Sequence, residues 1–143
     1  MMEQRTEEWH QARLGKVTSS RIADVMMKPT TAGYSNYRAQ LICERLTGLP
    51  TEGFTSAAMQ HGTDTEPQAR AFYEMETGLN VSETGFVDHP TLQMSGASPD
   101  GLVGADGLVE IKCPTSMAKH DEALQTGAHA QEYKWQLHHQ MFV

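Results

Sequence analysis

The chain contains the stretch Ser98-Pro99-Asp100-Gly101 and, after a short turn, Gly107-Leu108-Val109-Glu110-Ile111-Lys112-Cys113-Pro114. Alternate residues of a β-strand point to the same face, so Glu110 and Lys112 are expected to be neighbours, roughly 7 Å apart at the backbone. Asp100 lies at the turn that begins this hairpin and can fold back toward Glu110. The stretch therefore predicts a hairpin that brings two carboxylates and a lysine together.

These three side chains suit the hydrolysis of a phosphodiester. Two converging carboxylates make a hard-oxygen site for magnesium or manganese, and a neighbouring lysine can orient or deprotonate a water molecule. The metal draws charge off the phosphate, and a second ion can stabilise the leaving oxygen. The pattern therefore favours a metal-dependent nuclease.

The bare pattern also occurs elsewhere in the chain by chance. Asp121 is followed by Glu132-Tyr133-Lys134, with no strand pattern around them. On the pattern alone, the first stretch can equally well be an ordinary turn followed by a strand whose charged face is exposed to solvent.

The periodicity of apolar residues indicates an α+β fold. Short runs separated by turn residues predict a strand meander over 79–87, 92–97, 102–103 and 108–113. Helical spacing and caps predict helices from Thr6 to about Gly15, through Ile22 to Met26, over 35–47, from Thr65-Glu66-Pro67 to Gly78, and from Met117 to the terminus.

The composition fits one soluble domain over residues 1–143. Apolar residues make up 38% of the chain and charged residues 20%, with no biased tract. No stretch approaches the roughly 18 consecutive apolar residues of a membrane span, and the N-terminus lacks a secretory apolar region. A cytoplasmic location is therefore expected.

The net charge does not decide the function. The formal charge of −7 argues mildly against a nucleic-acid coat protein, because phosphate binding normally rests on a basic surface. The carboxylates of a metal site contribute to this balance, however, and bound cations reverse the local sign.

The cysteines and histidines do not indicate a zinc or disulfide site. Cys43 and Cys113 are far apart in sequence and are expected to be buried thiols. Adjacent histidines on a helix point about 100° apart, so His138 and His139 do not form the i, i+4 pair of a helical metal site with His129.

Five blocks of sequence resemble a known family. They are Glu7-x-Trp9-His10-x-x-Arg13-Leu14-Gly15-x-x-Thr18-x-Ser20, Gly62-x-x-x-Glu66-x-x-Ala69-Arg70, Thr77-Gly78-x-Asn80-Val81-x-Glu83, Ser98-Pro99-Asp100-Gly101 and Glu110-Ile111-Lys112-Cys113-Pro114. In this order they resemble the lambda exonuclease family and its YqaJ-like viral recombinase relatives, and they cover nearly the whole chain.

The resemblance implies a restriction-endonuclease-like fold, with a small mixed central sheet flanked by helices. It also implies that a ring-shaped homotrimer, with Mg²⁺ or substituting Mn²⁺, digests one strand of linear double-stranded DNA from the 5′ end to mononucleotides. A single-strand annealing protein is the implied partner in phage recombination. Relatives continue beyond residue 143, so part of the sheet and of the trimer contact is expected to be missing.

The resemblance assigns roles around a metal. Asp100 and Glu110 match the metal-binding carboxylates, and the carbonyl of Ile111 would lie beside them. Lys112 matches the catalytic lysine, and Glu66 matches a further acidic residue near the metals.

The resemblance also assigns a pocket for the 5′-terminal phosphate. Its residues are Arg13, Ser20, Ser98 and Gln136. A guanidinium grips phosphate through two donors, while hydroxyls and an amide complete the shell. Such a pocket would account for attack at DNA ends, as in an exonuclease, rather than at internal sites, as in an endonuclease.

Other interpretations remain open at this stage. Ser20 can be a helix cap, Arg13 a surface charge and Glu66 a first-turn acid. The whole chain can also be a DNA-end-binding or inhibitory module with little turnover, or a structural fragment that joins trimers of a full-length partner.

Overall fold

The structure, a computed structural model, describes residues 2–51, 53 and 55–143. The chain divides into two compact units, each assembled from segments distant in sequence. The first comprises residues 1–52, 84–99 and 134–143, and the second comprises residues 53–83 and 100–133. The prediction of a single domain over 1–143 stays a prediction.

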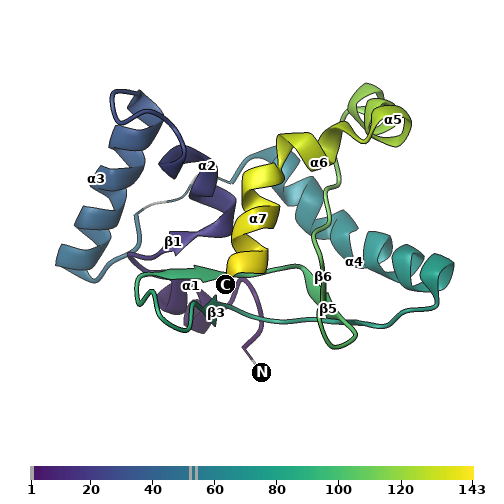
Figure 1. The fold of residues 1–143 in the computed structure, drawn as a ribbon, viewed down its shortest axis with the longest axis horizontal. Coiled ribbons are helices and arrows are strands. Elements are labelled where there is room, and N and C mark those ends of the chain that lie inside the picture. Colours follow the sequence, from purple (N-terminus) through teal and green to yellow (C-terminus); the bar gives the residue numbers. More distant parts are fainter. Residues whose placement is uncertain (1, 52, 54) are drawn as a thin grey trace. The chain divides into compact units, whose positions relative to one another are not determined.

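The first unit contains short helices and one long helix. They are α1 (Glu7–Arg13), η1 (Ser19–Arg21), α2 (Ile22–Val25), α3 (Ala32–Thr47) and α7 (Lys134–Phe142). The Thr6 hydroxyl caps α1 by accepting from the Trp9 N–H, and α3 ends where Gly48 adopts a left-handed conformation. Figure 1 shows α7 beside α2, and α7 also packs against η1.

The first unit also contains a three-stranded mixed sheet. Its strand order is β1 (Val17–Thr18), β4 (Ser95–Ala97), β3 (Val87–Asp88), with β1 parallel and β3 antiparallel to β4. All three residues of β4 are buried. A Cβ on Gly96 would come within 2.3 Å of the Phe86 ring, so this position needs glycine.

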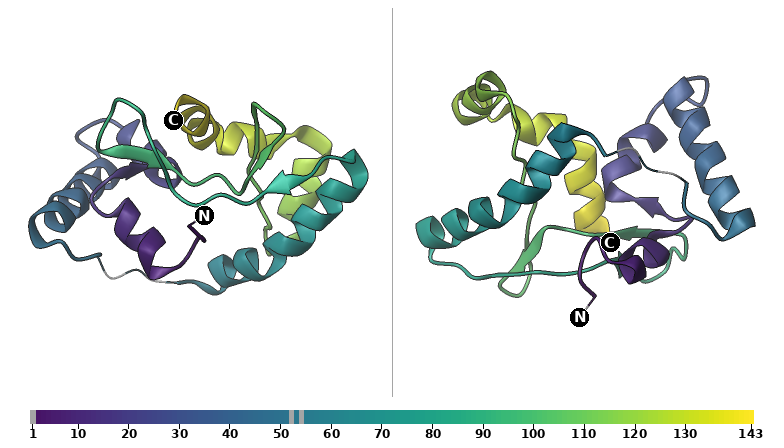
Figure 2. Two further views of the ribbon diagram at one scale, coloured as in Figure 1. Left: turned by 90° about the horizontal axis from the view of Figure 1, so that it is seen from below. Right: turned by 180° about the vertical axis from the view of Figure 1, so that it is seen from behind.

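The second unit contains α4 (Ala57–Thr77), α5 (Met117–Thr126) and α6 (Ala128–Glu132). Its antiparallel sheet has the order β2 (Val81–Ser82), β5 (Gly101–Val103), β6 (Gly107–Val109). Strands β5 and β6 form the predicted hairpin (Figure 2). The turn of this hairpin includes Gly104, which has a positive φ of 62°.

The α+β class, with small sheets flanked by helices, is confirmed, but the sheet and several boundaries differ from the prediction. The described strands form two three-stranded sheets rather than one central sheet. Helix α4 begins well before Thr65, because the Ser56 hydroxyl caps it by accepting from the Met59 N–H, and Pro67 lies inside the helix. Proline at this position removes one N–H donor without ending the helix.

The hydrophobic core of the described residues is small. Its buried apolar side chains are Trp9, Tyr37 and Ala97. Cys43 is exposed and Cys113 is partly buried, so the prediction of two buried thiols is wrong. The part of the chain described by the structure contains no helix that is long and apolar enough to span a membrane.

Candidate functional site

The β5–β6 hairpin positions two of the predicted carboxylates. The last cross-strand pair joins Gly101 to Val109, so Asp100 immediately precedes the hairpin and Glu110 immediately follows it. Asp100 Oδ2 accepts a hydrogen bond of 2.6 Å from the Ile111 N–H. The Ile111 N–H thus bonds to the Asp100 side chain instead of to a neighbouring strand. This explains why β6 ends at Val109 and not, as predicted, at Cys113.

Glu110 and Lys112 contact each other, as the alternation of the sequence predicted. Lys112 Nζ lies 2.5 Å from Glu110 Oε1. The side chain of Glu110 is 6% exposed and that of Lys112 is 28% exposed, so the pair is largely shielded from water. Lys112 Nζ also lies 4.6 Å from the centroid of the Tyr133 ring, at a distance typical of a cation–π contact. The sequence patterns did not predict this contact between Lys112 and Tyr133.

Glu66 lies on α4, where Arg70 holds it. Arg70 Nη2 is 2.7 Å from Glu66 Oε1, and Arg70 Nη1 pairs with Glu83. Glu66 is buried, and the guanidinium partly balances its charge. Arg70 had no predicted role, although its i, i+4 spacing from Glu66 on a helix was a signal for this contact.

The carboxylates of the second unit influence one another electrostatically. Burial raises the pKa of Asp100 to about 7, and the negative charge of Glu110 adds to the rise. Glu66 acts in the same direction, whereas the Ile111 N–H opposes it. Burial also raises the pKa of the Cys113 thiol, with help from Glu66 and Asp100. We call Glu66, Asp100, Glu110 and Lys112 the carboxylate cluster.

The chemistry of the carboxylate cluster fits a hard divalent cation, although its carboxylates are engaged with other groups. Among the described residues, no three His, Cys, Asp or Glu side chains are gathered closely enough to hold a metal ion. Glu110 instead contacts Lys112, and Glu66 contacts Arg70. The raised pKa of Asp100 shows that a further negative charge is costly there, and a cation would relieve that cost.

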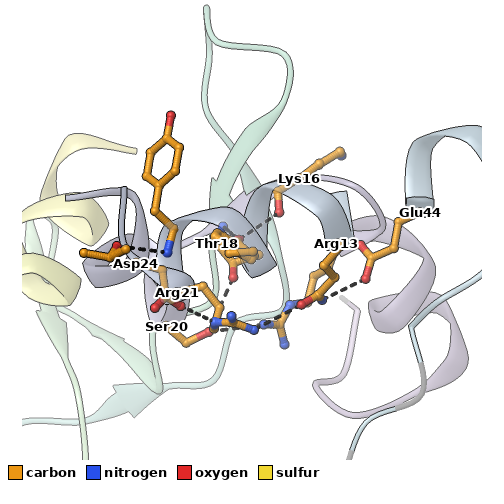
Figure 3. A network of polar contacts seen from close by, with 11 residues as sticks. Arg13, Lys16, Thr18, Ser20, Arg21, Asp24 and Glu44 are labelled. Atoms are coloured by element: carbon orange, nitrogen blue, oxygen red, sulfur yellow. Dashed lines mark hydrogen bonds and ion pairs between the residues drawn. The ribbon is translucent and has the colours of Figure 1, made fainter. Parts of the chain in front are cut away.

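A second cluster, in the first unit, contains three of the four residues predicted to bind phosphate. Arg13 Nη2 lies 3.5 Å from Ser20 Oγ, and the guanidinium carbon lies 3.8 Å from the centroid of the Trp9 ring. Trp9 Nε1 donates a hydrogen bond of 2.9 Å to Ser98 Oγ. Figure 3 shows Arg13 and Ser20 facing each other, with Thr18 in contact with Ser20. Trp9 thus joins Arg13 to Ser98, a role that its i, i+4 spacing from Arg13 could have suggested.

Arg13 is a partly buried cation. It lies in the last turn of α1, and burial lowers the pKa of its guanidinium, while Tyr37 and Glu44 act in the opposite direction. Arginine remains protonated even so, and a desolvated guanidinium favours an anionic partner.

The fourth predicted residue, Gln136, lies on α7 and is partly buried. Helix α7 packs against η1, which carries Ser20. His139, on the same helix, contacts Ser19 of η1. Gln136 therefore belongs to the same unit as Arg13, Ser20 and Ser98, whereas the carboxylate cluster belongs to the second unit.

Comparisons with known proteins identify the family. Residues 8–143 match the model of the YqaJ-like viral recombinase domain, so the chain belongs to this family. The crystal structure of an alkaline exonuclease, LHK-Exo, from Laribacter hongkongensis is similar, with a TM-score of 0.86 and 55% sequence identity. A structure of LHK-Exo in complex with dAMP is also similar, with a TM-score of 0.85 and 56% identity.

These comparisons confirm the family inferred from the five sequence blocks. Each similarity covers 95% of this chain and 67% of the LHK-Exo chain, so that protein has structure that this sequence does not span. A search of curated proteins finds no match.

Proposed function

We propose that the protein is a magnesium-dependent exonuclease that degrades one strand of linear double-stranded DNA from the 5′ end and releases mononucleotides. The family and the similarity to an alkaline exonuclease support this function. The observation that carries the proposal is the carboxylate cluster: Asp100 has a raised pKa beside Glu110, and Lys112 contacts Glu110.

Asp100, Glu110, the carbonyl of Ile111 and Glu66 would hold Mg²⁺, or Mn²⁺ in its place. These are hard oxygen donors, which such ions prefer. When bound, the ion draws charge off the scissile phosphate and lowers the pKa of water. A divalent cation would also offset the two causes that raise the pKa of Asp100, namely burial and the negative charge of Glu110.

Lys112 would orient the attacking water through its ammonium group. Its three N–H donors can hold a water oxygen beside the phosphate, and the positive charge stabilises negative charge that develops during the attack. The contacts with Glu110 and Tyr133 restrict the position of Nζ. A restricted donor loses less entropy when it reaches the reacting geometry.

Arg13, Ser20 and Ser98, together with Gln136, would bind the terminal 5′ phosphate. The Arg13 guanidinium carbon lies 3.8 Å from the centroid of the Trp9 ring, a contact that restricts the guanidinium, and this planar group can donate two parallel hydrogen bonds to phosphate. Recognition of a terminal phosphate restricts attack to DNA ends and favours the 5′ end.

The assembly also belongs to the proposal. By family resemblance, the protein forms a homo-oligomer, namely a trimer, and passes the exposed 3′ strand to a single-strand annealing protein. Sedimentation of the chain alone tests the first part, and co-purification with such a protein tests the second.

Arg13→Lys is expected to weaken the preference for 5′-phosphorylated DNA. Lysine keeps the charge but loses the planar pair of donors, so the ratio of digestion rates on 5′-phosphorylated and 5′-hydroxyl duplexes should fall about ten- to a hundredfold. Arg38→Lys is the matched control because Arg38 is exposed on α3. An unchanged ratio in a folded Arg13→Lys protein would contradict the role of Arg13.

The polarity of digestion tests the function itself. A linear duplex labelled at either the 5′ or the 3′ end of one strand is incubated with the protein and Mg²⁺. We expect the 5′ label to leave first as a mononucleotide. Release of the 3′ label first would contradict the polarity, and tight binding to DNA ends without release of either label would favour the end-binding module instead.

A further inference from the structure

His139 is a buried histidine that contacts two serines at once. Its Nδ1 lies 2.7 Å from Ser19 Oγ, and its Nε2 lies 2.9 Å from Ser95 Oγ. His139 is 9% exposed, and both serines are buried as well. Burial lowers the pKa of His139, and His89 acts in the same direction, which favours the neutral ring. A neutral imidazole has one donor and one acceptor nitrogen, so one serine donates to the ring and the other accepts from it.

These two contacts join three elements of the first unit. His139 lies on α7, Ser19 on η1 and Ser95 on β4. These three elements come from distant parts of the chain. Strand β4 also pairs with β1, the strand that precedes η1. The imidazole therefore connects η1, β4 and α7 by directional bonds, in addition to the packing of α7 against η1 and β4.

Each joined element carries or adjoins a residue of the proposed phosphate pocket. Ser20 follows Ser19 directly, and Ser98 lies just beyond the end of β4. Gln136 precedes His139 by about one turn of α7, and residues three apart on a helix lie on the same side. Three of the four predicted phosphate ligands therefore lie on or next to elements that the His139 side chain connects.

We propose that His139 is a positioning residue for the 5′-phosphate pocket, which sets the placement of Ser20, Ser98 and Gln136 relative to one another. This inference rests on the proposed function. The three groups come from separate elements, so a small shift of any element would misplace a donor. A misplaced donor weakens or loses its hydrogen bond to the phosphate, so the affinity for a 5′-phosphorylated end should fall.

The test compares His139→Leu with His139→Gln. Leucine fills similar space without hydrogen bonds, whereas the glutamine amide retains one donor and one acceptor. His138→Leu is the matched control, because His138 is the exposed neighbour on α7. Ser19→Ala and Ser95→Ala remove single hydroxyls and keep the test valid if His139→Leu fails to fold. KM and kcat are measured for each variant on 5′-phosphorylated and 5′-hydroxyl duplexes.

We expect His139→Leu to raise KM about tenfold on the 5′-phosphorylated duplex, with kcat and the values for the 5′-hydroxyl duplex nearly unchanged. His139→Gln should restore most of the loss, and each serine variant should show part of it. A folded His139→Leu protein with an unchanged preference for 5′ phosphate, beside a wild-type protein that has the preference, would overturn this inference alone. A wild-type protein without the preference would overturn both the inference and the proposed pocket.

Discussion

Asp100→Asn is expected to abolish digestion and, at the same time, to stabilise the metal-free protein at alkaline pH. The pKa of Asp100 is raised from 3.8 to about 7, mainly by burial and by Glu110. A carboxyl whose pKa is raised by folding destabilises the folded state increasingly as the pH rises from about 3.8 to about 7, and the whole cost is present above that range. Each pKa unit corresponds to about 1.4 kcal/mol, so removing the charge should gain a few kcal/mol at pH 8.

The loss of activity has a different cause. Asparagine can still accept the hydrogen bond from the Ile111 N–H, so the hairpin end should persist. It carries no negative charge for a divalent cation, and stabilisation by a metal ion contributes several kcal/mol, so the rate should fall about a thousandfold or more.

Thermal unfolding in EDTA at pH 8 and at pH 4.5, together with a digestion assay, checks both parts of this prediction. The gain in Tm should be large at pH 8 and small at pH 4.5, and Mg²⁺ should raise the Tm of the wild-type protein but not that of the variant. Asp106→Asn, at the exposed turn of the same hairpin, should change neither property. A lower Tm for Asp100→Asn at pH 8 would show that the charged form of Asp100 does not destabilise the folded protein.

Lys112→Ala is expected to lower the rate of nucleotide release about a hundred- to ten-thousandfold, the range typical of a group that assists proton transfer or orients water. Affinity for DNA ends should change little, because the residues proposed to bind the terminal phosphate do not include Lys112. Gel-shift and single-turnover assays separate the two quantities.

The chain supplies its own matched control for Lys112. Lys134 closes the chance pattern Glu132-Tyr133-Lys134, and its Nζ lies 5.2 Å from the centroid of the Trp135 ring, outside the carboxylate cluster. Lys134→Ala should therefore digest DNA at nearly the wild-type rate. Equal losses in both variants would mean that positive charge, rather than the position of Lys112, supports the activity.

The sequence predicted those parts of the site that depend on local periodicity. Strand alternation placed Glu110 beside Lys112, and the turn before the hairpin placed Asp100 near the hairpin end. Both contacts span a few residues or one hairpin, over which backbone geometry alone determines what can meet.

Contacts between distant segments could not be predicted in this way. Strand β1 was not predicted because two residues give no periodic signal, and its partner β4 is far away in sequence. The contacts of His139 with Ser19 and Ser95 likewise depend on tertiary packing. The early start of α4 was not predicted because Pro67 indicated the first turn of the helix. Proline can also lie inside a helix, at a cost in stability, as Pro67 does here.

A time course on linear and covalently closed circular duplex DNA, each with Mg²⁺ or with EDTA, tests whether the protein is a metal-dependent exonuclease. The released mononucleotides are quantified by chromatography. We expect steady release from 5′-phosphorylated linear DNA with Mg²⁺, and no release from circular DNA or in EDTA. Equal degradation of circular DNA, or undiminished release in EDTA, would contradict a metal-dependent exonuclease.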